Sequence, residues 1–118
     1  MKYSATQNYI NGKFTDASSG RKLDVVSPLD GSLLSTVPMS VSKDLDDAVK
    51  AAKAAFPAWS RMPIKERVQV FFRYKTLLEK NLQELAKLCS EENGKTYSES
   101  VAEIEKSIEL TEFATSLP

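Results

Sequence analysis

The stretch Ala54-Ala55-Phe56-Pro57-Ala58-Trp59-Ser60 decides how this chain folds, because it separates two long helical patterns. Before it, apolar residues recur at the three- and four-residue spacing of an amphipathic helix. We expect Ser42 to cap this first helix and Pro57 to end or kink it at Phe56. The apolar stripe consists of Leu45, Ala48, Val49, Ala52, Ala55 and Phe56.

A second helical pattern follows the aromatic-proline stretch. Pro63 suits the first turn of a helix, and apolar residues continue at helical spacing to Cys89 except at Lys75, which interrupts the stripe. Gly94 suits the left-handed residue that ends a helix. The pattern therefore predicts one helix from Pro63 to about Asn93, roughly 45 Å long at about 1.5 Å per residue.

A third helix is predicted after Gly94. Thr96-Tyr97-Ser98-Glu99 matches the capping-box pattern, in which the first and fourth residues bond each other's backbone N–H groups. Apolar residues then recur to the end of the chain. They are Val101, Ile104, Ile108, Leu110, Phe113, Ala114 and Leu117.

The first 41 residues indicate short strands and turns. Asn11-Gly12 between Tyr9-Ile10 and Lys13-Phe14 is a strong signal for a two-residue hairpin. A second and a third short strand are predicted, at 23–26 before Ser27-Pro28 and at 33–37 before Pro38. We expect these strands to form a meander that needs a cover over its apolar face.

Composition restricts the function classes. Sixteen basic residues balance sixteen acidic ones, so no net charge favours nucleic acid or an anionic membrane. No apolar run approaches the roughly 20 residues of a membrane span, and a single cysteine excludes an internal disulfide framework. The cytoplasm is the expected location. Histidine is absent, which removes the commonest general base and metal ligand.

Two features that suggest catalysis or nucleotide binding have simpler interpretations, and a third motif is absent. Cys89 is interpreted as a small apolar residue on the helix stripe rather than a nucleophile. Gly94-Lys95-Thr96 resembles the end of a phosphate loop, but Cys89 stands where that loop requires its first glycine. The four glycines, Gly12, Gly20, Gly31 and Gly94, form no Gly-x-Gly-x-x-Gly pattern.

Acidic and aromatic clusters are also interpreted structurally. The glutamates of the third helix suggest a solvated face more than paired carboxylates or a metal site. They are Glu99, Glu103, Glu105, Glu109 and Glu112. Trp59 and Phe56 are interpreted as an aromatic plug at a corner between helices rather than a ligand-stacking pair.

In order and spacing, these motifs resemble the N-terminal segment of the aldehyde dehydrogenase superfamily. The resemblance rests on Tyr9 to Phe14, on Ser27-Pro28-Leu29-Asp30-Gly31 with Val37-Pro38, and on the helical run from Ala48 to Lys95. Ser27 replaces the family's usual asparagine. Three segments are most similar to the CoA-acylating methylmalonate-semialdehyde dehydrogenases: Asp24 to Pro28, Val37-Pro38-Met39-Ser40, and Glu112 to Pro118.

The resemblance implies an α/β fold and a definite chemistry for the full-length enzyme. A cysteine attacks the aldehyde, hydride passes to NAD, and CoA takes the acyl group. The family's catalytic cysteine, its oxyanion asparagine and its nucleotide-binding residues lie beyond residue 118, so we expect no catalytic, cofactor-binding or metal-binding residue in this chain. In some relatives a structural cation binds at the turn matching Val25 and Val26 and at an acid near Glu103.

We therefore interpret residues 1–118 as an incomplete part of an NAD-binding domain, with a β-meander over 1–41 and helices over 42–118. Three apolar helix faces exceed what three short strands cover, so a missing sheet or another chain is expected to pack on them. We expect the fragment alone to be inactive. The expected partners are the remainder of a homo-oligomeric enzyme, or further copies of the chain. The alternative is a truncated, non-catalytic relative that self-associates through its helices.

Overall fold

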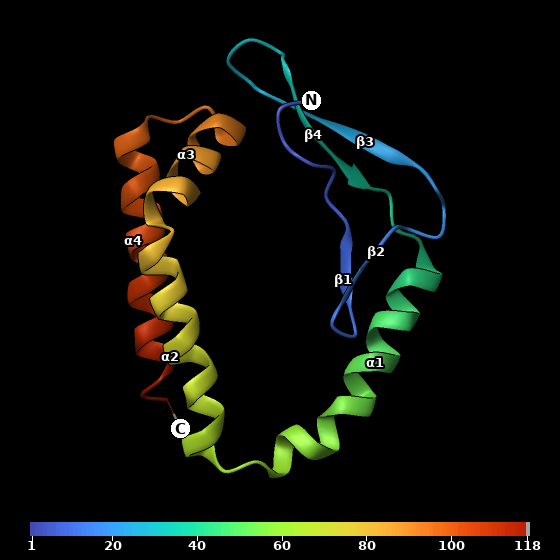
Figure 1. The fold of residues 1–118 in the computed structure, drawn as a ribbon, viewed down its shortest axis with the longest axis vertical. Coiled ribbons are helices and arrows are strands. Elements are labelled where there is room, and N and C mark those ends of the chain that lie inside the picture. Colours follow the sequence, from blue (N-terminus) through green and yellow to red (C-terminus); the bar gives the residue numbers. More distant parts are fainter. Residues whose placement is uncertain (118) are drawn as a thin grey trace. The chain divides into compact units, whose positions relative to one another are not determined.

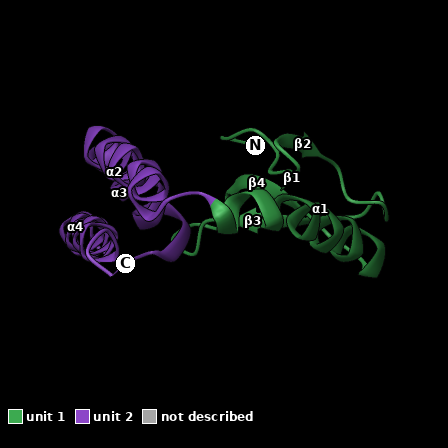
Figure 2. Ribbon diagram, turned by 90° about the horizontal axis from the view of Figure 1, so that it is seen from below, with its two compact units in different colours: residues 1–61 green, residues 62–118 purple. Residues whose placement is uncertain are grey.

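The computed structural model describes residues 1–117, which form four strands and four helices. They divide into two compact units, residues 1–61 and residues 62–118 (Figure 2). Unit 1 contains the strands and the first helix, and unit 2 contains the other three helices (Figure 1). The predicted order, short antiparallel strands followed by helices, is confirmed.

The predicted Asn-Gly hairpin is confirmed. Strand β1 (Asn8–Ile10) pairs antiparallel with β2 (Lys13–Thr15), and the two residues between them are Asn11 and Gly12. Their φ angles are 52° and 76°, and a two-residue type I′ turn requires positive values at both positions. The sequence signal was therefore sufficient to fix both the turn and the register of this hairpin.

The other two strands form a separate sheet, so the predicted single meander is wrong. Strand β3 (Lys22–Val26) pairs antiparallel with β4 (Leu33–Pro38), while β2 and β3 belong to different sheets. The segment between β2 and β3 is bound to the first helix through Ser18 and Asp44 instead of turning directly back along β2. Pro38 lies within β4 as its last residue, a position where a missing N–H is tolerated.

Asp44 organises the beginning of helix α1 (Ser42–Arg61). Its Oδ2 accepts a hydrogen bond from the Val41 backbone N–H at 2.8 Å, and its Oδ1 accepts from the backbone N–H and the hydroxyl of Ser18 at 2.9 and 2.5 Å. The first intrahelical bond is accepted by the Val41 carbonyl, so the predicted cap at Ser42 is wrong by one residue. Ser42 is instead the first helical residue.

Helix α1 does not end at Pro57. It continues to Arg61, although proline removes one backbone donor and crowds the preceding turn. Figure 1 shows that the helix bends toward its C-terminal end. The bend agrees with the alternative that Pro57 kinks the helix rather than terminating it.

The predicted long helix is two helices, which is the main correction to the expected three-helix architecture. Helix α2 (Ile64–Lys80) and helix α3 (Leu82–Asn93) meet at Asn81. The Asn81 side chain donates to the Leu77 carbonyl at 2.7 Å, and its backbone N–H donates to the same oxygen at 3.1 Å. Asparagine side chains compete with helical hydrogen bonds in this way, and Asn81 leaves helical geometry at φ −106°, ψ 12°.

The predicted end of the second helical pattern and the start of the next helix are confirmed. Gly94 has φ 81° and its N–H donates to the Ser90 carbonyl at 2.8 Å. Helix α4 (Tyr97–Ala114) begins with a complete capping box between Thr96 and Glu99. The hydrogen bonds from Thr96 lower the pKa of the Glu99 carboxyl.

Small residues allow α4 to pack against both α2 and α3. Ala86 on α3 and Ser100 on α4 are fully buried, and Ile108 on α4 is 9% exposed. The Ser100 hydroxyl donates to the Thr96 carbonyl at 3.0 Å, so its burial leaves no unpaired donor. In unit 1 the buried apolar residues are Ala17 and Leu34.

We predict that Ile108→Ala will lower the free energy of unfolding by about 2–4 kcal/mol, because it leaves a cavity between α4 and the helices it contacts. Urea unfolding followed by helical circular dichroism measures this change. Leu110→Ala is the matched control, since Leu110 is 58% exposed. Equal losses for the two variants would contradict the packing described here.

We also predict that Asp44→Asn will lower the melting temperature at neutral pH. The hydroxyl of Ser18, and then the Val41 N–H, hold the pKa of the folded Asp44 carboxyl below 3.8. The stabilisation is therefore present above the unfolded pKa and is lost as pH falls through the lower folded value. The difference between wild type and variant should shrink below about pH 3.8. Asp46→Asn, on the exposed face of α1, is the control.

Candidate functional site

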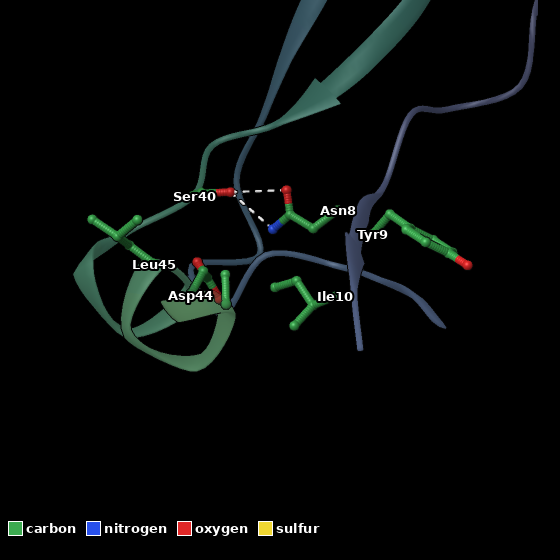
Figure 3. A pocket seen from close by; sticks show the side chains of 7 residues that line it. Asn8, Tyr9, Ile10, Ser40, Asp44 and Leu45 are labelled. Carbon is green, nitrogen blue, oxygen red and sulfur yellow. Dashed lines mark hydrogen bonds between the residues drawn. The ribbon is translucent and has the colours of Figure 1, made fainter. Parts of the chain in front are cut away.

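Unit 1 contains a groove between β1 and the beginning of α1. Figure 3 shows Ile10 extending from β1 toward the helix, while Tyr9 projects to the other side of the strand. Asn8 and Ser40 close one end, where the Asn8 amide nitrogen donates to the Ser40 hydroxyl at 2.9 Å and the hydroxyl lies 3.1 Å from the amide oxygen. The lining residues are Asn8, Tyr9, Ile10, Ser40, Asp44, Leu45 and Ala48.

Alanines extend this surface along α1. The continuing groove lies between the β1–β2 turn and the side of the helix, and it includes Tyr9, Ile10, Asn11, Gly12, Ala48, Ala51, Ala52 and Ala55. We call the two parts together the alanine groove. Its floor has small apolar side chains, which permit close approach of another backbone.

The chemistry of the alanine groove suits binding rather than catalysis. The carboxylate at its edge, Asp44, is 7% exposed, and both of its oxygens accept hydrogen bonds from the protein. A general base needs an oxygen available to the substrate proton. Asp44 therefore has a positioning role here, and sequence reasoning missed it because Ser18 lies 26 residues away.

Unit 2 has its own apolar groove at the break between α2 and α3. It is lined by Tyr74, Leu77, Leu78, Asn81, Glu84, Leu85 and Leu88. The break at Asn81 turns leucines from both helices toward one surface. Unit 1 and unit 2 thus each present an apolar groove that the described residues do not fill.

Lys75, which interrupts the apolar stripe, pairs with two glutamates. Its Nζ lies 2.8 Å from Glu79 on the same helix and 3.2 Å from Glu112 on α4. Glu79 and then Glu112 raise the pKa of the Lys75 ammonium. The residue that breaks the sequence pattern is thus an electrostatic link between α2 and α4.

The Gly94-Lys95-Thr96 segment is a helix stop followed by a cap, as the sequence predicted. Lys95 forms an ion pair with Glu103, which is the largest cause of its raised pKa. The ammonium group is thereby directed to a side chain of the next helix. Glu103 belongs to unit 2, whereas Val25 and Val26 belong to unit 1, so the cation site implied by the family resemblance stays a prediction.

The remaining candidate residues are the cysteine, the aromatic pair and the glutamates of α4. Cys89 is a free, half-buried thiol on α3, less buried than a core residue. Phe56 is 64% exposed and Trp59 38% exposed. The predicted aromatic plug would lie between α1 and α2, which belong to different units, so it stays a prediction. Among the glutamates of α4, Glu109 pairs with Lys106 at 2.6 Å, and Glu105 is exposed.

Among the described residues, no helix begins with the glycines of a pyrophosphate site, and the expected absence of cofactor-binding and metal-binding residues stays a prediction. Gly12, Gly20 and Gly31 lie outside the helices and Gly94 ends one, whereas a pyrophosphate site needs glycines that open a helix. Carboxylates of Asp44 and Glu99 occupy the first turns of α1 and α4. Within residues 1–117 no group of three potential ligands, and no helix suited to crossing a membrane, is found.

Comparison with known proteins identifies the family. The model of the aldehyde dehydrogenase family matches residues 14–118. Malonate-semialdehyde dehydrogenase 2 of Geobacillus kaustophilus is 41% identical over 112 residues, which is 95% of this chain. The chain spans only 23% of the length of that relative.

Solved structures of dehydrogenases also match this chain. A protein of Sinorhizobium meliloti 1021, assigned as a methylmalonate-semialdehyde dehydrogenase and solved in complex with NAD, matches with a TM-score of 0.91 and 35% identity. The match covers 100% of this chain and 24% of that one. An NADP-dependent enzyme of E. coli matches with a TM-score of 0.91 and 32% identity, over 94% of this chain and 23% of its own.

The family model thus covers most of the sequence, and the structure matches that of the Sinorhizobium meliloti protein over the whole chain. The family that the motifs indicated is confirmed, including its similarity to the semialdehyde dehydrogenases. The chain belongs to the aldehyde dehydrogenase family.

Proposed function

We propose that this chain is the N-terminal part of an NAD-dependent dehydrogenase that converts a malonate-type semialdehyde to an acyl-CoA. The observation that carries the proposal is the match of 95% of the chain, at 41–44% identity, to proteins named malonate-semialdehyde dehydrogenase. The NAD complex of a structural relative supports a nicotinamide cofactor for the longer protein. CoA enters through the similarity to the CoA-acylating subfamily alone.

The proposed role of these residues is to build and position the enzyme rather than to carry its chemistry. The alanine groove and the groove at Asn81 are apolar surfaces without a cover in either unit. In the proposed enzyme, the remaining three quarters of the polypeptide supplies that cover. Burial of apolar area contributes roughly 25 cal/mol per Å², so these surfaces would hold the segment in place.

The cofactor and the nucleophile belong, in this proposal, to parts of the protein outside this chain. When bound, the nicotinamide ring accepts the hydride that oxidation of the aldehyde releases. Cys89 is half-buried on α3, and the chain contains no histidine to activate a thiol. The proposed setting is a cytoplasmic homo-oligomer without nucleic-acid or membrane partners, as the balanced charge suggests.

We predict that this segment functions in place of its counterpart in a relative. In the Geobacillus kaustophilus enzyme, the segment of 112 residues that aligns with this chain is replaced by the corresponding residues of this chain. NADH formation from malonate semialdehyde is then measured. We expect activity within about tenfold of the parent, which corresponds to a rise of at most ~1.4 kcal/mol in barrier height. Omitting CoA should slow the reaction of the chimera and of the parent alike.

Two controls make this experiment decisive. The relative without its N-terminal segment should be inactive, and the 118-residue chain alone should give no aldehyde-dependent NADH. A well-folded, inactive chimera would contradict the proposed equivalence. Activity of the isolated chain would contradict the positioning role, and activity independent of CoA would contradict the acyl-transfer step.

A second candidate function is self-association as a non-catalytic module. It is favoured by the exposure of Leu45, Val49 and Phe56 on α1, which together form an apolar stripe. Two copies of the chain would then cover each other's grooves.

This alternative predicts a discrete dimer or larger assembly in sedimentation velocity. Leu45→Lys should shift it toward monomer, because a charged side chain in a buried apolar interface carries a large desolvation cost. Lys43→Glu, at an exposed position two residues away, is the matched control and should leave the assembly intact. A folded monomer would rule out the alternative and leave the enzyme proposal unaffected.

A further inference from the structure

Three dipeptides in this chain have an asparagine or aspartate directly before a glycine, the arrangement in which a cyclic imide forms most easily. They are Asn11-Gly12, Asp30-Gly31 and Asn93-Gly94. In each, the backbone nitrogen of the glycine can attack the side-chain carbonyl carbon of the residue before it, and glycine has no side chain to hinder that attack. The attacking nitrogen must first be free of other hydrogen bonds. The structure separates the three dipeptides on this criterion.

Two of the three glycine backbone nitrogens are already hydrogen-bonded. Gly31 donates its N–H to the Ser27 carbonyl at 2.8 Å, and Gly94 donates to the Ser90 carbonyl at 2.8 Å. The Asp30 carboxylate also accepts a hydrogen bond from the Ser32 N–H at 3.0 Å. Imide formation at these two sites therefore requires a local opening that breaks at least one bond.

The nitrogen of Gly12 is free. No residue within 1–117 accepts a hydrogen bond from it, because it lies at the centre of a two-residue hairpin turn. Asn11 is exposed. Its backbone φ of 52° lies in the left-handed region, which residues with a side chain adopt uncommonly. A Cβ placed on Gly12 would meet no atom within 4 Å, so the turn has open space in which to rearrange.

We propose that Asn11 is a site of spontaneous deamidation, with water as the only co-reactant. The Gly12 nitrogen, after losing its proton to solvent, forms a bond to Cγ of Asn11. The bond from Cγ to the amide nitrogen breaks, and ammonia leaves with the proton returned by solvent. Water then opens the imide at one of its two carbonyls. The product is aspartate or isoaspartate at position 11, and no oxidant or reductant is needed.

The modification changes the alanine groove, because Asn11 and Gly12 line it beside Ala48 and Ala52. Either product adds a negative charge at the edge of an apolar surface. The isoaspartyl product also lengthens the backbone of a turn whose two residues set the register between β1 and β2. Deamidation would thus weaken any apolar partner's contact with this part of unit 1.

The test is an incubation of the 118-residue chain in mildly alkaline buffer, followed by peptide mass mapping. Tryptic peptides 3–13 and 88–95 separate the two Asn-Gly dipeptides, and fragmentation distinguishes Asn8 from Asn11. We expect Asn11 to deamidate at least about tenfold faster than Asn93, the ratio that ~1.4 kcal/mol of local opening would produce. In urea the two rates should converge, since both are then unstructured Asn-Gly dipeptides.

Further measurements keep the proposal falsifiable. Asn11→Gly retains a turn sequence compatible with positive φ and should abolish the fast-forming acidic species. Amide hydrogen exchange should be fast at Gly12 and slower at Gly31 and Gly94. The proposal is overturned if Asn93 deamidates as fast as Asn11 in the folded chain, if Asn11 is stable there while both react in urea, or if the Gly12 amide is protected from exchange.

Discussion

The carboxylate of Asp44 is the interaction on which the arrangement of unit 1 depends. It satisfies the exposed backbone donor at the start of α1 and, with its other oxygen, binds the segment that connects the two sheets. One side chain thus ties that connecting segment to the beginning of the helix. The alanine groove exists because β1 and α1 are held side by side without filling the space between them. A helix cap, usually a local device, here determines a surface.

Features encoded by neighbouring residues were predictable from the sequence. The Asn11-Gly12 turn, the left-handed Gly94 and the Thr96–Glu99 capping box each depend on contacts within a few positions. The features that escaped prediction depend on competition or on distant partners. Asn81 has the spacing of a helical residue, yet its side chain also bonds the Leu77 carbonyl and its backbone leaves helical geometry. The bond between Asp44 and Ser18 spans 26 residues and carries no local signature.

The candidate sites follow the same division. The residues of Gly94-Lys95-Thr96 were correctly interpreted as a helix stop and cap, because both motifs are local. The role of Lys75 was not foreseen, since a lysine in an apolar stripe signals only an interruption until Glu112 on α4 is seen beside it. The grooves themselves were anticipated only as surplus apolar faces. Which strands or helices border them required the structure.

The packing of α3 against α4 has a consequence for how the sequence is able to vary. Ala86 and Ser100 have no exposed surface at all, and both side chains are already small. Any increase in volume at either position must push backbones apart in a densely packed interior. A larger side chain at either position is therefore expected to destabilise the packing of α3 against α4. Two small residues, rather than any reactive group, thus make this part of unit 2 sensitive to side-chain volume.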